Sequence, residues 1–139
     1  MGDKSAFLTD DWLAALQEES QKLLDARPHG EVAIYSYAER FANAPEPGDA
    51  DRRPGYKMDI LNGKVTIRGG VSETETANCV VVIDYDAAFA TLDVKSGPEL
   101  DALSKQAFDK GLIEIRGSFD GMPIDLAALH DAMVERTAV

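Results

Sequence analysis

The strongest candidates for acid–base chemistry are three consecutive residues, Asp84, Tyr85 and Asp86, which follow an apolar run at residues 79–83. A carboxylate and a phenol beside an apolar cavity suit a small cone-shaped isomerase or dehydratase, with the aspartate as base and a tyrosine as hydrogen-bond donor. An aspartate directly after a strand also caps the helix that follows, by accepting bonds from its free N–H groups. We favour the capping role for Asp84 or Asp86 and keep the enzyme as an alternative.

The other reactive side chains are isolated from one another in the sequence. Cys79 is the only cysteine, and its apolar neighbours predict a packed thiol, because a nucleophile would need a base beside it. His29 and His130 are far apart, and His130 is expected at the surface or at the core boundary. No HExxH, CxxC or phosphate-cradling glycine motif is present. The sequence therefore predicts no metal site, no cofactor and no catalytic residue.

Composition narrows the classes of partner. At 139 residues the chain has the size of one domain, so residues 1–139 are treated as a single unit. Its 14 basic and 25 acidic residues give a formal net charge of −11, which repels nucleic acid and disfavours docking on anionic lipid headgroups. No apolar window is long enough to span a membrane, and no signal peptide or peroxisomal tail is recognised. A cytoplasmic protein without stable membrane insertion is expected.

The first third of the chain predicts a helix, a strand and a connection. The helix is expected from residue 9 or 10 to 26, with acidic residues at the positive end of its dipole. A strand over residues 31–41 follows, and its alternation places Tyr35 and Tyr37 on one face. These tyrosines are expected to brace the sheet, with a place at a cavity mouth as the alternative. The proline-rich segment 42–54 is predicted as a plain connection, with a lid over a pocket as the alternative.

A β-hairpin over residues 56–69 is the clearest local signal. Asn62-Gly63 is the preferred dipeptide of a tight primed turn between two strands. Counting outward from this turn predicts the pairs Leu61–Lys64, Ile60–Val65, Asp59–Thr66 and Met58–Ile67. The side chains then divide into one apolar and one polar face, so another layer must cover the apolar one.

The second half of the chain is expected to hold two more strands and three helices. A strand over residues 78–85 is apolar enough for a central position in a sheet. A short helix over residues 86–92 follows, and then a longer helix whose start carries Ser96 and Glu99 at capping-box spacing. Gly111 is expected to end that helix.

A strand over residues 112–117 and a closing helix from Pro123 to about Arg136 complete the prediction. The closing helix is expected to present one apolar stripe, made by Met122, Leu126, Leu129 and Met133. Because the strands cluster, the order of elements predicts the α+β class. Helices are expected to cover one face of a five-stranded, mostly antiparallel sheet.

From Trp12 to Arg136 this order of elements resembles the sterol carrier protein family, the non-specific lipid-transfer type. The resemblance rests on an apolar strand that ends in Asp84, a helix near Phe89, a second helix before Lys-Gly-Leu-Ile-Glu-Ile-Arg-Gly (110–117), and a last helix. It implies a sheet and helices with an apolar tunnel between them. It also implies binding of fatty acids, acyl-CoA, sterols or similar molecules without chemistry. The net negative charge of the chain does not fit the basic site that the phosphates of CoA would need.

The leading hypothesis is a small, non-catalytic carrier of a hydrophobic small molecule or lipid. The ligand contacts are expected at apolar side chains spread along the chain: Trp12, Leu16, Ile67, Val81, Phe89, Leu103, Phe108, Ile115, Met122, Leu126 and Met133. One alternative is the isomerase or dehydratase that uses Asp84 or Asp86 with a tyrosine. Another alternative is an accessory partner of a larger enzyme, with an apolar face as the interface.

Overall fold

The main sheet of the protein has five strands in the order β4-β3-β2-β5-β6. The computed structural model describes residues 4–26, 34–45 and 53–139. The strands of this sheet are β2 (Ile34–Ala42), β3 (Arg53–Leu61), β4 (Lys64–Val71), β5 (Cys79–Asp84) and β6 (Ile113–Gly117). Neighbouring strands are antiparallel except for β2 and β5, which are parallel. The predicted α+β class with a mostly antiparallel sheet is confirmed.

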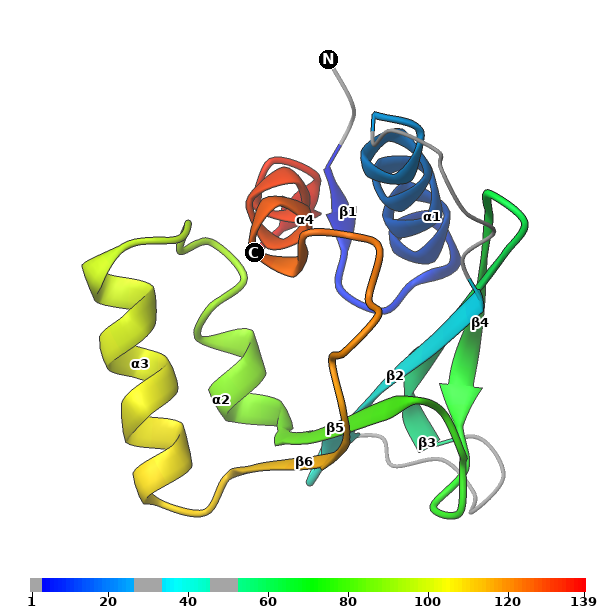
Figure 1. The fold of residues 1–139 in the computed structure, drawn as a ribbon. Helices are drawn as coiled ribbons and strands as arrows, with labels where there is room; N and C mark the ends of the chain where they lie inside the picture. Colours follow the sequence, from blue (N-terminus) through cyan, green and yellow to red (C-terminus); the bar gives the residue numbers. More distant parts are fainter. Residues whose placement is uncertain (1–3, 27–33, 46–52) are drawn as a thin grey trace.

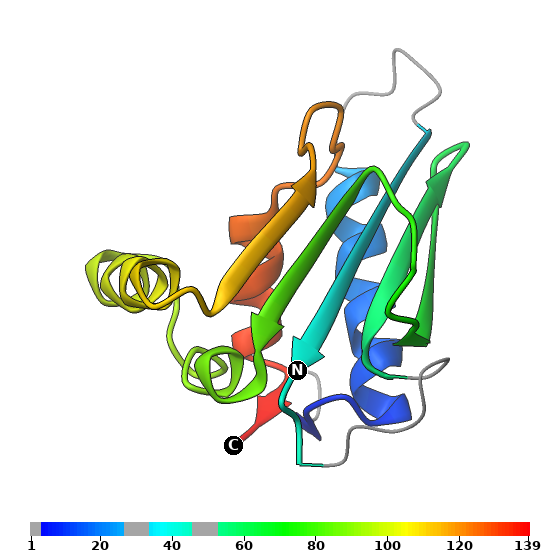
Figure 2. The same ribbon diagram turned by 90° about the horizontal axis from the view of Figure 1, so that it is seen from below.

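Two helices form a layer over one face of this sheet. The helices are α1 (Asp10–Asp25), α2 (Tyr85–Phe89), α3 (Pro98–Asp109) and α4 (Leu126–Val134). Figure 1 shows α1 and α4 side by side above the sheet, whereas α2 and α3 lie beyond the end of β5 and beside β6. The opposite face of the sheet is turned toward the viewer in Figure 2, and no helix of the described residues lies over it.

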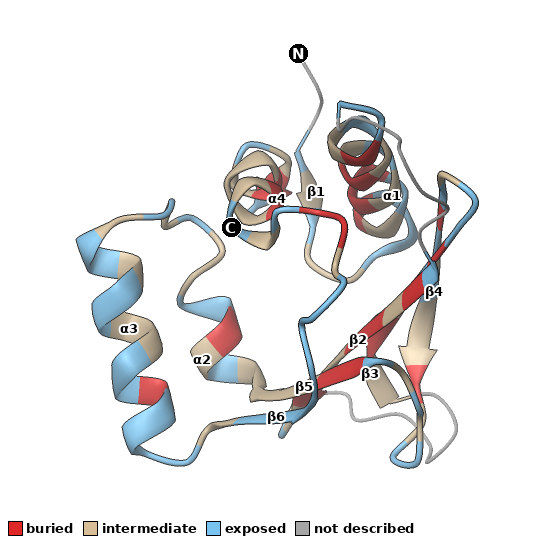
Figure 3. Cartoon of the chain, viewed as in Figure 1, coloured by how far each residue is buried: buried red, intermediate tan, exposed pale blue. Residues whose placement is uncertain are grey.

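Helix α1 begins where the sequence predicts it. The Thr9 hydroxyl oxygen accepts a bond from the Trp12 backbone N–H at 3.3 Å, and Asp10 and Asp11 occupy the first turn. It packs against the sheet and α4, and its buried residues are red in Figure 3. They are Trp12, Ala15, Leu16, Ser20 and Leu24.

The same helix protects an exposed edge of the sheet. Strand β4 is an edge strand, so some of its N–H groups have no partner strand. The Oε1 atoms of Gln21 and Gln17 accept bonds from the backbone N–H groups of Val65 and Ile67, at 2.8 and 2.9 Å. These two bonds block further strand pairing at this edge and fix α1 against the sheet.

The hairpin of β3 and β4 has the predicted register. All four predicted pairs are present, from Leu61–Lys64 to Met58–Ile67. Asn62 and Gly63 have φ angles of 53° and 78°, the left-handed conformation that a type I′ turn requires at both central positions. Met58, Ile60 and Val65 are buried in the main core, so the apolar face of the hairpin is the face that the helices cover.

The predicted start of the closing helix is wrong. Helix α4 begins at Leu126, because the Asp125 carboxylate accepts bonds from the N–H groups of Ala127 and Ala128 at 3.0 and 3.2 Å. Pro123 and Met122 therefore precede the helix, and Met122 is not part of its apolar stripe. The helix also ends two residues before Arg136.

One other local prediction needs correction. Helix α3 has Gly97 rather than Ser96 at its N-cap position, and no side chain caps it. The Ser96 backbone N–H instead donates to the Asp131 carboxylate at 2.7 Å, which ties it to α4. Pro98 does stand in the first turn, as expected. Strand β5 is an interior strand between β2 and β6, as its apolar run predicts.

Some predictions lie outside the described residues. These are the start of the strand at residues 31–33, the middle of the connection 42–54, and His29. The two described ends of the chain meet in a small parallel sheet of β1 (Ser5–Ala6) and β7 (Thr137–Ala138).

Candidate functional site

A cavity of about 480 Å³ lies between the sheet and the helices. This volume is within the range of about 300–1,000 Å³ that small-molecule sites occupy. Its lining includes apolar side chains of α1, the sheet and α4: Trp12 and Leu16, Phe41 and Ile83, and Leu126 and Met133. Residues of α2 and α3 and of the segment between them complete the wall.

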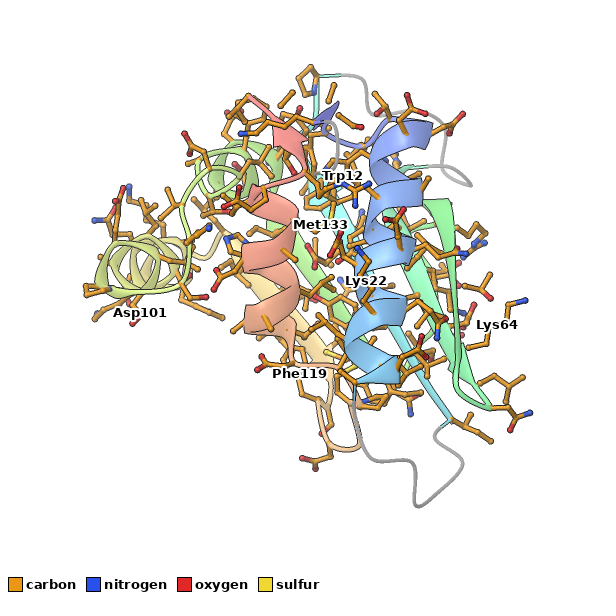
Figure 4. All side chains as sticks on the ribbon, turned by 90° about the horizontal axis from the view of Figure 1, so that it is seen from above. Trp12, Lys22, Lys64, Asp101, Phe119 and Met133 are labelled. Carbon is orange, nitrogen blue, oxygen red and sulfur yellow. The ribbon has the colours of Figure 1, made fainter. Side chains whose placement is uncertain are left out.

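Trp12 and Met133 form the wall where α1 faces α4. Figure 4 shows both side chains in the space between these two helices. The Trp12 indole N–H donates to the Thr137 hydroxyl at 2.9 Å, and that hydroxyl donates to the Met133 carbonyl at 2.6 Å. The ring of Phe7 packs edge-on against Trp12 with 5.0 Å between ring centroids. Because these groups are buried and paired, the wall is held in one arrangement.

The acidic side chain that the sheet contributes to this largely apolar cavity is Glu39. Its Oε2 atom accepts hydrogen bonds from the hydroxyl groups of Tyr37 and Tyr56, at 2.7 and 2.6 Å. The exposed fractions of the two tyrosines are only 4% each. This hydrogen-bonded carboxylate places a fixed polar group in a mainly apolar wall.

Sheet geometry explains why these three side chains meet. Alternate residues of a strand point to the same face, so Tyr37 and Glu39 of β2 lie on the face that the helices cover. Tyr56 of β3 stands directly opposite Glu39 in the antiparallel register. Side chains of directly opposite residues lie within contact distance on the same face.

Both tyrosines keep their hydroxyl protons, and so remain hydrogen-bond donors, at neutral pH and well above it. Burial, followed by the nearby Glu39 charge, raises the pKa of Tyr37 and of Tyr56 well above 10. An ionised phenolate beside this carboxylate would place two like charges next to each other in the core. The hydroxyl protons therefore stay in place and point at Glu39.

The rim of the cavity is tied to α4 by polar contacts. The Nε2 atom of His130 lies 2.7 Å from the Val94 carbonyl oxygen, so this nitrogen carries the proton. In the same segment, the Ser96 backbone N–H donates a hydrogen bond to the Asp131 carboxylate. His130 is partly buried, which confirms the predicted boundary position. The segment between α2 and α3 is thus attached to α4, whereas α3 itself buries only Ala107.

The described part of the cavity wall contains no lysine or arginine. Among the described residues that line it, the ionisable side chains are Glu39, Asp101, His130 and the two tyrosines. Asp101 comes from α3 and is exposed. A ligand with an acidic head group would therefore find no counter-charge in the described wall.

The structure gathers four of the residues expected to contact a ligand. Trp12, Leu16, Leu126 and Met133 all line the cavity. Their role in binding stays a prediction, as does the continuation of the cavity into a tunnel.

The other seven expected residues do not line the cavity. Ile67, Val81 and Met122 are partly buried and pack against the main core. Leu103 is a partly buried residue of α3. Phe89, Phe108 and Ile115 have exposed fractions of 43%, 49% and 43%. These exposed side chains are the surface that the accessory-partner alternative would need, and that alternative stays a prediction.

The structure gives Asp84 the capping role. Its Oδ2 atom accepts bonds from the N–H groups of Asp86 and Ala87, at 3.1 and 3.3 Å, at the start of α2. A bond from the Asn43 side chain, together with these backbone bonds, lowers the pKa of Asp84 below its ordinary value of 3.8. An isomerase base would need a raised pKa and a place in the cavity, and neither Asp84 nor the exposed Asp86 lines it.

Cys79 is the packed thiol that the sequence predicts. Its side chain is fully buried in the core, and burial raises its pKa, so it is held as the neutral thiol. In the described part of the chain, no three side chains of His, Cys, Asp or Glu gather closely enough to hold a metal ion. None of the described helices has the length and apolar character needed to cross a membrane.

Sequence reasoning missed Glu39. The alternation that placed Tyr35 and Tyr37 on one face of the strand continues to Glu39, which puts an acidic residue among core positions. A charged residue in phase with buried aromatic residues is the signal that identifies this position. The sequence does not show that Tyr56 lies opposite it, because that pairing depends on how β2 and β3 align.

Two solved structures share the fold of the chain. One is a solution structure of a conserved hypothetical protein from Thermus thermophilus, described as possibly a sterol carrier protein. It has a TM-score of 0.59 and 18% identity, over 99% of this chain and 97% of that one. The other is a crystal structure of sterol carrier protein 2, with a TM-score of 0.58 and 20% identity, over 96% of this chain and 99% of that one. No protein-family model matches the sequence, and neither does any curated protein.

Proposed function

Since the chain has the fold of the sterol carrier proteins, we propose that it is a non-catalytic carrier of a hydrophobic small molecule or lipid. The observation that carries this proposal is the cavity of about 480 Å³ between the sheet and the helices. Apolar side chains dominate its wall, and their burial against a ligand would stabilise the complex by about 25 cal/mol per Å².

Fatty acids, acyl-CoA and sterols are the ligand classes that the family resemblance suggests. The wall supports an apolar ligand of this kind, because a chain or ring system needs mainly dispersion contacts and exclusion of water. Catalysis is not part of the proposal, since Asp84, a candidate base of the alternative enzyme hypothesis, caps a helix.

The single tryptophan of the chain reports directly on the cavity, because Trp12 is part of its wall. We expect titration with 1-dodecanol to change the Trp12 emission in a saturable way, with one ligand bound per chain. Native mass spectrometry of the same mixture would give the stoichiometry independently.

A pair of variants on one helix separates binding in the cavity from binding elsewhere. Ala88 is buried and lines the cavity, whereas Ala90 at the end of the same helix is exposed. Ala88→Phe should lower the affinity about tenfold, since losing contact with two methylene groups already costs about 1.6 kcal/mol. Ala90→Phe should bind like the unchanged protein. If no hydrophobic ligand binds, or if both variants bind equally well, the proposal is wrong.

A further inference from the structure

The carboxylate of Glu39 is half satisfied by the protein. Both tyrosine hydroxyls donate to the same oxygen, Oε2. Among the described residues, no hydrogen bond reaches the second oxygen, Oε1, and no lysine or arginine forms an ion pair with Glu39. A carboxylate oxygen has room for two donors, so the side chain retains free acceptor capacity on the cavity wall.

The position of this acceptor is fixed rather than adaptable. Tyr37 and Tyr56 are held by burial on two neighbouring strands, and each reaches Glu39 from a different direction along the sheet. Their rings lie close together, with 6.2 Å between centroids. The two tyrosines therefore position the carboxylate, and their own donor hydrogens are already committed to it.

An acceptor that is fixed, negatively charged and surrounded by apolar surface discriminates between ligands by their head groups. A hydroxyl or an ammonium group would donate a hydrogen bond to it, and such charge-assisted bonds are stronger than neutral ones. A carboxylate head group would instead add a second negative charge, with no basic side chain of the described wall to offset it.

On this basis we propose that Glu39 is the polar anchor of the cavity, and that it selects hydrophobic ligands whose head group donates a hydrogen bond, a hydroxyl or a primary ammonium. This inference rests on the proposed carrier function and refines it. It disfavours free fatty acids among the three ligand classes, because their head group is a carboxylate at neutral pH.

Three ligands with the same twelve-carbon tail test this selection: dodecylamine, 1-dodecanol and dodecanoate. The expected order of affinity in calorimetric titration at pH 7 is dodecylamine, then 1-dodecanol, then dodecanoate. Dodecylamine should bind at least about tenfold more tightly than dodecanoate. A hydrogen bond to a charged group raises the affinity about tenfold to a hundredfold. This ranking requires no variant of the protein.

The variant Glu39→Gln keeps the shape and an acceptor oxygen but removes the charge. It should lower the affinity for dodecylamine about tenfold and bring the three ligands closer together. Glu99→Gln is the matched control, because Glu99 is exposed on α3 and does not line the cavity. Circular dichroism would establish that both variants are folded.

The outcomes separate this inference from the carrier function. If dodecanoate binds as tightly as dodecylamine, or if Glu39→Gln leaves the ranking unchanged, Glu39 is not the anchor although the protein still binds ligands. If none of the three ligands binds, the carrier function fails and the inference fails with it.

Discussion

The indole N–H of Trp12 donates a hydrogen bond to the hydroxyl of Thr137 at 2.9 Å, across 125 residues of chain. This bond joins the first helix to the last strand, and both residues are buried. The same hydroxyl donates its own hydrogen to the Met133 carbonyl, so the first turn of α1 and the end of α4 are connected through one atom. The wall of the cavity thus depends on contacts between the two ends of the sequence.

Removing this hydroxyl should destabilise the protein. Thr137→Val keeps the size of the side chain but leaves the Trp12 N–H buried without a partner. We expect the free energy of unfolding to fall by about 1–3 kcal/mol in urea denaturation. Thr137→Ser retains the hydroxyl and should cost less than Thr137→Val. Equal losses in the two variants would mean that the bond contributes little.

The sequence predicted the elements more successfully than the site. The hairpin register followed from Asn62-Gly63 because turn type and alternation act over neighbouring residues. Of the four cavity residues, Leu126 and Met133 belong to the predicted apolar stripe of the closing helix, and Trp12 and Leu16 lie within the predicted first helix.

Features that depend on long-range packing were not predictable in the same way. The exposure of Phe108 depends on α3 standing away from the sheet, and no periodicity shows that. The start of α4 was misplaced because Pro123 is an acceptable first-turn residue, and the Asp125 cap two positions later prevailed. The role of Glu39 depends on a partner from a different strand.

Two glycines should differ in their tolerance of a side chain. Gly63 has a φ of 78°, and no neighbouring atom lies within 4 Å of the place that a Cβ would take, so Gly63→Ala should cost only about 1–2 kcal/mol of backbone strain. Gly55 has a φ of 153°, and a Cβ there would lie 2.2 Å from the backbone oxygen of Glu39. Gly55→Ala should cost about 1–3 kcal/mol more than Gly63→Ala, because β3 must move away from β2.

Thermal or chemical denaturation of the two glycine variants would measure this difference. Because Tyr56 follows Gly55 directly, the shift of β3 should also weaken the bond between Tyr56 and Glu39. A Gly55→Ala protein as stable as Gly63→Ala would show that the two strands can separate at little cost.

Asp84 should titrate as a helix cap. Its folded-state pKa lies below 3.8, chiefly because of the bond from Asn43, so its contribution to stability is present above the unfolded-state pKa. That contribution is lost as the pH falls through the lowered folded-state value. Asn43→Ala should move the pKa of Asp84 upward, toward its ordinary value. Carboxyl-carbon NMR titration would measure both values, and a pKa of Asp84 clearly above its ordinary value in the unchanged protein would instead favour the acid–base role.

Helix α3 should be less protected against hydrogen exchange than α1. It buries only Ala107, whereas α1 buries five residues, so local opening of α3 costs less free energy. Leu100 and Ser104 of α3 line the cavity, so 1-dodecanol should slow exchange in α3 and leave α1 nearly unchanged. Slower exchange in α3 than in α1 without ligand would contradict this expectation.

The most direct test of the carrier proposal is to locate a bound ligand by NMR. With methyl-labelled protein and 1-dodecanol, we predict nuclear Overhauser effects between the alkyl chain and the methyl groups of Leu16, Leu126 and Met133, which line the cavity from both helices. Effects confined to exposed methyl groups such as those of Leu61 and Ile115, or none at all, would show that the cavity does not hold a hydrophobic ligand.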